Sequence, residues 1–199
     1  MTTTFTMRRA LFAGIATFAA LAFAAGCGED TGNSDNATDA ETSTATDVEF
    51  NDADVAFAQM MIPHHEQAVE MAELAQQHAA DPEIKSLADQ IISSQGEEIA
   101  TMTAMLDEWG APVEMEGHGD MNMGGMATED QMAELEAARG AEFDRLFVEL
   151  MIAHHQGAID MAETELAEGQ NPEALALAEE IVEAQTAEIT TLEEIQAQL

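Results

Sequence analysis

Two His-His pairs are the residues of this 199-residue chain best suited to chemistry. They lie in the segments FAQMMIPHHEQAVEMAE, from Phe57, and FVELMIAHHQGAIDMAE, from Phe147, which are offset by 90 residues and identical at 9 of 17 positions. Imidazole nitrogen and thioether sulfur both bind soft transition metals such as copper(I). The candidate metal ligands of the two segments are therefore His64, His65, Met61 and Met71 in the first and His154, His155, Met151 and Met161 in the second.

Helical spacing places one histidine of each pair on an apolar face. At 100° per residue, His64 falls on the same side of a helix as Phe57 and Met61, whereas His65 falls at the edge of that side. The second segment repeats this arrangement at the positions 90 residues later. The spacing therefore predicts two helices that each carry a central and a peripheral histidine.

Inward carboxylates on the following helices complete this candidate site. Glu98 and Glu188 fall on the apolar faces of their helices, again 90 residues apart. Buried polar groups are costly unless they are paired or bound to an ion. Two interpretations follow: a metal site that includes both glutamates, or a structural network in which His64 and His154 hydrogen bond to Glu188 and Glu98.

A second candidate site lies in a methionine-rich linker over residues 110–127. Thioether sulfur is soft and carries no titrating proton, so closely spaced methionines bind copper(I) or silver(I) even in acid. Glycines between them would let the loop wrap an ion. The alternative is an apolar loop that packs over the end of the domain. The candidate ligands of the linker are Met115, His118, Met121, Met123 and Met126.

Helix signals divide the rest of the chain into two similar hairpins. Asp81-Pro82 and Asn171-Pro172 each place an N-cap residue before a proline at the first helical position. The pattern predicts long helices at 53–79, 82–109, 141–168 and 172–197, and a short one at 129–138. Two amphipathic hairpins bury their apolar faces by packing together, so we expect an all-α four-helix bundle made of two duplicated antiparallel helical hairpins.

The first 50 residues have the composition of a leader and a tether. Residues 1–26 carry two arginines, an apolar run and small residues before Cys27, which predicts a lipoprotein signal peptide, exported by the general or the twin-arginine route. Cys27, the only cysteine, would be the lipidated residue; otherwise it is an ordinary residue of a cleaved secretory signal. Residues 27–50 are polar and acidic, as in a disordered tether. The bundle domain would then span 51–199.

The charge of the chain limits its partners. It has 40 Asp and Glu against 5 Lys and Arg, a net charge of −35. Beyond residue 26 the basic residues are only Lys85, Arg139 and Arg145, so the exported part carries 3 − 40 = −37. Such a charge excludes binding to nucleic acid and attracts cations. The chain contains no nucleophile elbow, phosphate loop or dinucleotide fingerprint.

The repeated MI-x-HH motif resembles that of the ferritin-like family called domain of unknown function 305. The likeness extends to Gln95-x-x-Glu98, Gln185-x-x-Glu188 and Trp109, and covers about residues 51–199. The family includes CopM-like periplasmic copper-binding proteins. The resemblance implies a ferritin-like helical bundle, export, and binding of copper or silver by histidine and methionine.

These observations favour a binding protein over an enzyme. We expect an extracytoplasmic, lipid-anchored protein of the cell membrane that captures or buffers copper(I) or silver(I), with a copper-handling protein or a second copy of itself as a partner. One alternative is a ferritin-like di-iron oxidase, but di-iron sites use more carboxylates than the two inward glutamates. The other is a structural or partner-binding lipoprotein without metal.

Overall fold

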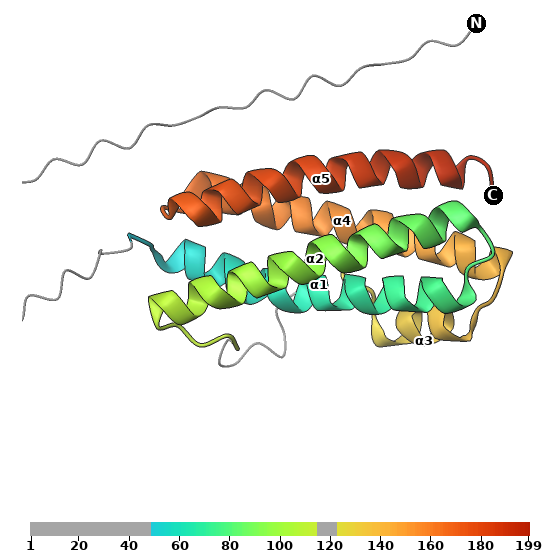
Figure 1. Ribbon diagram of the computed structural model, residues 1–199, viewed down its shortest axis with the longest axis horizontal. Helices are drawn as coiled ribbons and strands as arrows, with labels where there is room; N and C mark the ends of the chain where they lie inside the picture. Colours follow the sequence, from blue (N-terminus) through green and yellow to red (C-terminus); the bar gives the residue numbers. More distant parts are fainter. Residues whose placement is uncertain (1–48, 115–122) are drawn as a thin grey trace, which may run out of the picture. The chain divides into compact units, whose positions relative to one another are not determined.

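Five helices make up the part of the chain that the computed structural model describes, residues 49–114 and 123–199 (Figure 1). All of these residues belong to one unit of the chain, Ala45–Leu199. The helices are α1 (Asp52–His78), α2 (Pro82–Trp109), α3 (Glu129–Ala137), α4 (Ala141–Glu168) and α5 (Pro172–Gln196). Each bound agrees with the prediction to within one residue, and the all-α fold class is confirmed.

The helix ends form where capping chemistry predicts them. The side chain of Asn51 accepts hydrogen bonds from the backbone N–H groups of Ala53 and Asp54, and Asp54 returns the interaction in a capping box. Asp81 and Asn171 cap α2 and α5 in front of a proline. The caps matter because the first N–H groups of a helix have no partner within it.

The four long helices pack as two hairpins. α1 packs on α2 and α4 packs on α5, and the hairpins meet mainly through α1 and α4. Figure 1 shows the long helices side by side, with the short α3 lying along α1. The duplicated sequence therefore gives a four-helix bundle in which the two histidine-bearing helices are neighbours.

The core consists of two apolar clusters separated along every long helix by buried polar side chains. On α1, for example, one cluster contains Phe57, Ala58, Met61 and Ile62, and the other begins at Ala68. Both histidines of α1 lie between the two clusters. We call the intervening set the polar layer, which comprises His64, His65, Gln95, His154, His155 and Gln185.

At each end of the bundle, an aspartate joins the two hairpins. Asp54 of α1 accepts hydrogen bonds from the backbone N–H groups of Gln170 and Asn171, at 2.9 and 2.8 Å. Asp144 of α4, 90 residues later, accepts equivalent bonds from Ala80 and Asp81. Each helix of the α1–α4 pair therefore holds the turn of the other hairpin.

The bundle makes its first contacts slightly before residue 51. The ring of Phe50 stacks on Trp109, with centroids 5.2 Å apart, and Asn171 donates a hydrogen bond to the carbonyl oxygen of Glu49. The predicted signal peptide, Cys27 and most of the tether lie outside the described residues. In the part of the chain that is described, no helix is long and apolar enough to cross a membrane.

Candidate metal centre

The two central histidines meet in the middle of the bundle. The imidazole rings of His64 and His154 have centroids 3.8 Å apart and are tilted by 38°. Both side chains are fully buried. The contact between α1 and α4 thus brings together two residues that are 90 positions apart in the sequence.

The peripheral histidines are also buried, which the angular prediction did not anticipate. His65 and His155 have no exposed surface, because α2 and α5 cover the edges on which they lie. His65 Nε2 lies 2.6 Å from Glu98 Oε2, and His155 Nε2 lies 2.7 Å from Glu188 Oε2. The predicted pairing of His64 and His154 with the two glutamates is therefore wrong: each glutamate binds the peripheral histidine of its own hairpin.

Burial keeps the central pair neutral. Desolvation lowers the pKa of His64 to about 4. The hydrogen bond between its ring and the Gly124 carbonyl raises the pKa, but this effect is smaller. Desolvation lowers the pKa of His154 further, to about 2, and charge on His64 would add to this effect. At neutral pH both rings therefore keep the nitrogen lone pairs that a metal ion needs.

The hydrogen bonds of three histidines leave the same ring nitrogen free. Nε2 of His64 faces the carbonyl oxygen of Gly124 at 3.2 Å, and Nε2 of His65 and His155 faces a carboxylate. A neutral ring that donates from Nε2 carries its lone pair on Nδ1. Within residues 49–114 and 123–199, the Nδ1 atoms of these three rings are buried without a hydrogen-bond partner, as are both nitrogens of His154.

Two glutamines complete the polar layer, although the sequence prediction left them out of the ligand set. Gln95 and Gln185 are 1% and 3% exposed, and neither amide has a hydrogen-bond partner in the part of the chain that the structure describes. Both lie one turn before the glutamate that binds a histidine. Their duplicated spacing was the signal that could have included them.

The predicted methionine ligands divide into two groups. Met61 and Met151 are fully buried and lie one turn before His64 and His154. Met71, also fully buried, and the partly buried Met161 lie seven residues after the central histidines, about 10 Å along the helix. Only the first group is near enough along its helix to share an ion with the histidine pair.

The end of the methionine-rich linker closes over the central pair. Besides the Gly124 carbonyl on His64, the side chain of Gln67 donates to the Ala127 carbonyl at 2.9 Å and accepts from the Ala127 N–H at 2.8 Å. Gly157, the counterpart of Gln67 on α4, lets the linker approach, because a Cβ there would overlap the carbonyl oxygen of Gly124. We call residues 123–127 the strap.

The strap carries two of the predicted linker ligands. Met123 and Met126 are partly buried at its start and near its end. Met115, His118 and Met121 lie outside the described residues. Gln67, Gly124 and Gly157 were missed as site residues; the departure from the repeat at positions 67 and 157 was the only sequence signal for them.

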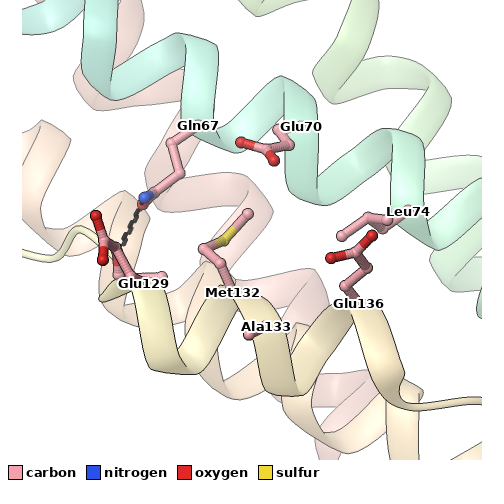
Figure 2. Close-up of a pocket in the computed structure, with 8 residues that line it drawn as sticks. Gln67, Glu70, Leu74, Glu129, Met132, Ala133 and Glu136 are labelled. Carbon is pink, nitrogen blue, oxygen red and sulfur yellow. Dashed lines mark hydrogen bonds between the residues drawn. The ribbon is translucent and has the colours of Figure 1, made fainter.

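An acidic groove of about 440 Å³ opens beside the strap, between α1 and α3. Figure 2 shows the carboxylates of Glu70, Glu129 and Glu136 around the thioether of Met132, next to the side chain of Gln67. All three carboxylates are exposed. Their charge concentrates cations near the strap without forming a closed site.

The arrangement suits a soft ion of low coordination number. Over residues 49–114 and 123–199, no three side chains of His, Cys, Asp or Glu come together as a metal-binding group. Hard ions and zinc require several such ligands. A pair of imidazoles with nearby thioethers is instead the type of ligand set that copper(I) accepts.

Comparisons with known proteins identify one matching family model and several similar solved structures. The family model described as Domain of unknown function (DUF305) matches residues 54–196. A DUF305 protein from Streptomyces coelicolor, whose name calls it a secreted protein, is 32% identical, with a TM-score of 0.69 over 73% of this chain and 91% of that one.

A solved protein with bound metal is also similar. CopM in its Cu(I)-bound form is 36% identical, with a TM-score of 0.61 over 71% of this chain and 93% of that one, and CopM has also been solved with Cu(II) and with silver. The uncharacterized protein L153 of Acanthamoeba polyphaga mimivirus is 48% identical over 48 residues. That match covers 24% of this chain and only 32% of the viral protein.

Proposed function

We propose that this chain, which belongs to the DUF305 family, binds copper(I) or silver(I) outside the cytoplasm. The observation that carries this proposal is the fully buried contact of His64 with His154, three of whose ring nitrogens have no hydrogen-bond partner among the described residues. Leaving such groups unpaired is costly, and a bound ion would satisfy them. The copper and silver forms of the similar CopM support the choice of metal.

The ion would be held by ring nitrogens of the central pair, with Met61 and Met151 as sulfur ligands. Nδ1 is the nitrogen of His64 that is available to bind the metal, because its Nε2 hydrogen bonds to the Gly124 carbonyl. His65 and His155 are the next candidates, and their carboxylate partners orient them. A histidine that donates its other N–H to a carboxylate is the usual arrangement around a bound metal. Glu98 and Glu188 would therefore act on the metal through the histidines.

The strap would connect this centre to the methionine-rich linker. Met123 and Gly124 are adjacent, so a residue of the soft-ligand loop precedes the carbonyl that contacts His64. We infer that the linker captures ions with Met115, His118, Met121, Met123 and Met126 and passes them to the histidines. The acidic groove beside Gln67 would raise the local cation concentration.

Two other functions make different demands on the site. A di-iron oxidase needs several carboxylates on one pair of ions, whereas Glu98 and Glu188 belong to different hairpins and each hydrogen bonds to a histidine. A structural lipoprotein needs no ion at all. Metal analysis of protein purified with iron and copper both offered would separate the three functions.

The place of action is also proposed. We infer that residues 1–26 direct export and that Cys27 is lipidated, so that the protein is anchored to the cell membrane. The name of the Streptomyces relative supports secretion. Replacement of Cys27 by Ser should move the protein from the membrane to the soluble fraction, and a wild-type protein already soluble after export would contradict the anchor.

The central experiment is thermal unfolding with and without buffered copper(I). At a free concentration one hundred times the dissociation constant, an ion bound only by the folded state stabilises it by about 2.7 kcal/mol. We expect this gain in the wild type and in the control His78→Gln, whose histidine lies at the far end of α1 beside Arg139. His64→Ala combined with His154→Ala should remove it. A wild type that gains no stability from copper(I) or silver(I) would show that the polar layer is structural.

A further inference from the structure

The end of α4 buries an acid that the metal site does not use. Glu165 is 1% exposed and lies about one turn before the last residue of α4. The equivalent position of the first hairpin is Ala75, also fully buried, so the two copies differ here by a complete carboxyl group. A buried carboxyl requires a specific partner.

That partner is a second carboxyl. Neither oxygen of Glu165 meets an N–H or O–H donor among the described residues, and its side chain lies within hydrogen-bonding reach of the carboxyl group of Asp54 of α1. Gly169 leaves room for it, since a Cβ at that position would overlap Glu165 Oε1. Two carboxyl groups can hydrogen bond to each other only when one of them carries a proton.

Asp54 is the member of the pair that is better suited to carry the negative charge. Its carboxylate accepts backbone N–H bonds from Asn51 at 2.6 Å, Gln170 at 2.9 Å and Asn171 at 2.8 Å. Three such donors stabilise negative charge and leave little use for a proton. A proton shared by the pair would therefore reside on Glu165.

No cation of the described chain is near enough to replace that proton. Lys85, Arg139 and Arg145 all lie at the opposite end, around the turn between α1 and α2 and the start of α4. The carbonyl end of α4 adds negative potential next to Glu165. Among the described residues, the other ionisable groups at this end of the bundle are all acids with exposed side chains, namely Glu49, Asp52, Asp107, Glu108, Glu163, Glu168 and Glu173.

We propose that Glu165 holds a proton at neutral pH and donates it to Asp54, forming a carboxyl latch that ties the start of α1 to the turn between α4 and α5. Loss of the proton to solvent places two buried negative charges side by side and opens the latch. Asn51 would be released with it, because its side chain bonds to the Glu168 carbonyl at 2.9 Å. This device does not depend on the proposed metal function.

The direction of both pKa values agrees with the latch. Burial raises the pKa of Glu165 to about 8, assisted by the hydrogen bond to Asp54 and by its charge. Burial alone would raise the pKa of Asp54, but the backbone donors and Glu165 bring it below the ordinary value. A raised acid pKa means that the latch contributes its full stability below the ordinary value of 4.5 and loses it as pH rises through about 8.

The test compares metal-free wild type with Glu165→Gln in the full chain. Gln is neutral at every pH and keeps a donor for Asp54. Between pH 5 and 8 the folded-to-unfolded ratio of the wild type, relative to Glu165→Gln, should fall by up to about tenfold per pH unit. Glu168→Gln, which changes an exposed acid in the same turn, should follow the wild type.

A direct measurement covers the case in which the variant fails to fold. The side-chain carboxyl carbon of Glu165 should titrate by NMR near pH 8 in the wild type, and the amides of Gln170 and Asn171 should lose exchange protection over the same range. Titration near 4.5, or parallel stability profiles of wild type and Glu165→Gln, would overturn the latch.

Discussion

The centre of the bundle and its α4–α5 end both bury ionisable groups, but they differ in symmetry. At the centre, His65–Glu98 and His155–Glu188 are equivalent pairs with distances of 2.6 and 2.7 Å. At the α4–α5 end, Asp54 of α1 faces Glu165 of α4, whereas at the opposite end Asp144 of α4 meets no such acid within the described chain, because α1 has Ala75 at the position equivalent to Glu165. The repeat therefore keeps both members of each pair at the centre, but at the ends it keeps the aspartate and not its acidic partner.

The two regions also respond oppositely to pH. The central histidines are buried as neutral bases, so acid charges them, whereas Glu165 is buried as a neutral acid, so alkali charges it. In both regions the buried form is the uncharged one. The comparison therefore predicts two opposing contributions to the stability profile, an acid arm from the histidines and an alkaline arm from Glu165, which overlap between pH 4.5 and 6.5 and can each be removed by a substitution.

The largest expected effect is the acid arm. A histidine with a lowered pKa in the folded state contributes stability above its ordinary value of 6.5, and this stability is lost as pH falls. For His64 alone, the loss between pH 6.5 and 4 corresponds to about 3 kcal/mol. His154 adds to it. Denaturant unfolding of the metal-free protein at several pH values would measure the loss.

A double variant isolates this arm. His64→Leu combined with His154→Leu removes both titrating rings, so this variant should no longer lose stability between pH 6.5 and 4, where only the opposing contribution of Glu165 is left. Glu165→Gln should leave the acid arm below pH 4.5 intact, because it acts on the other region. If the double variant and the wild type lose the same stability in acid, the central histidines are not the cause.

The pairing at the centre shows what helical periodicity can and cannot predict. Periodicity and capping residues gave the helix bounds to within one residue, because both depend on local sequence. The same angles placed His65 at an edge, but they could not say which helix covers that edge. The repeated spacing of 33 residues, from His65 to Glu98 and from His155 to Glu188, was the available signal for the observed pairs.

Removal of the two end aspartates would sharpen the comparison between the ends. Asp54→Ala leaves three backbone N–H groups without their acceptor and should cost roughly 2–3 kcal/mol. Asp144→Ala removes two such bonds and should cost roughly 1–2 kcal/mol. Chemical denaturation at pH 6 would measure both. Equal losses would mean that the ends are energetically alike and that Glu165 adds nothing to its end.

The strap is the second place where the copies differ. Gly157→Ala forces the strap away from α4 and should cost roughly 1–2 kcal/mol. Gln67→Ala removes two hydrogen bonds to Ala127 without a steric clash, and should cost about 1 kcal/mol. Thermal unfolding would rank the two. A Gly157→Ala variant as stable as the wild type would show that the strap does not need its close approach.

The strap and the carboxyl latch were beyond prediction for different physical reasons. The strap acts through the backbone carbonyl of Gly124, which has no signature in residue type or spacing. The repeat places an acid, Glu165, where the first copy has Ala75, so the sequence shows the difference. The partner of this acid, however, depends on the antiparallel contact of α1 with α4. The sequence therefore predicted the elements and the chemical character of the centre, and only tertiary packing fixes which groups meet.

The smallest expected effect on stability, and the sharpest on function, comes from the linker methionines. Replacing Met115, Met121, Met123 and Met126 by Leu conserves apolar volume, and Met123 and Met126 are only partly buried, so the free energy of unfolding should change by less than about 1.5 kcal/mol. Copper(I) capture by the linker should nevertheless disappear, because leucine offers no sulfur. Thioethers do not titrate, so wild-type capture should persist at pH 5, where His118 is mostly protonated if its pKa is ordinary. Competition with a copper(I) chelator at pH 5 and 7 would measure this.

Met102→Leu, an apolar change at a buried core position, is the matched control and should bind normally. A quadruple variant that keeps wild-type stoichiometry and affinity at both pH values would assign all copper binding to the centre of the bundle.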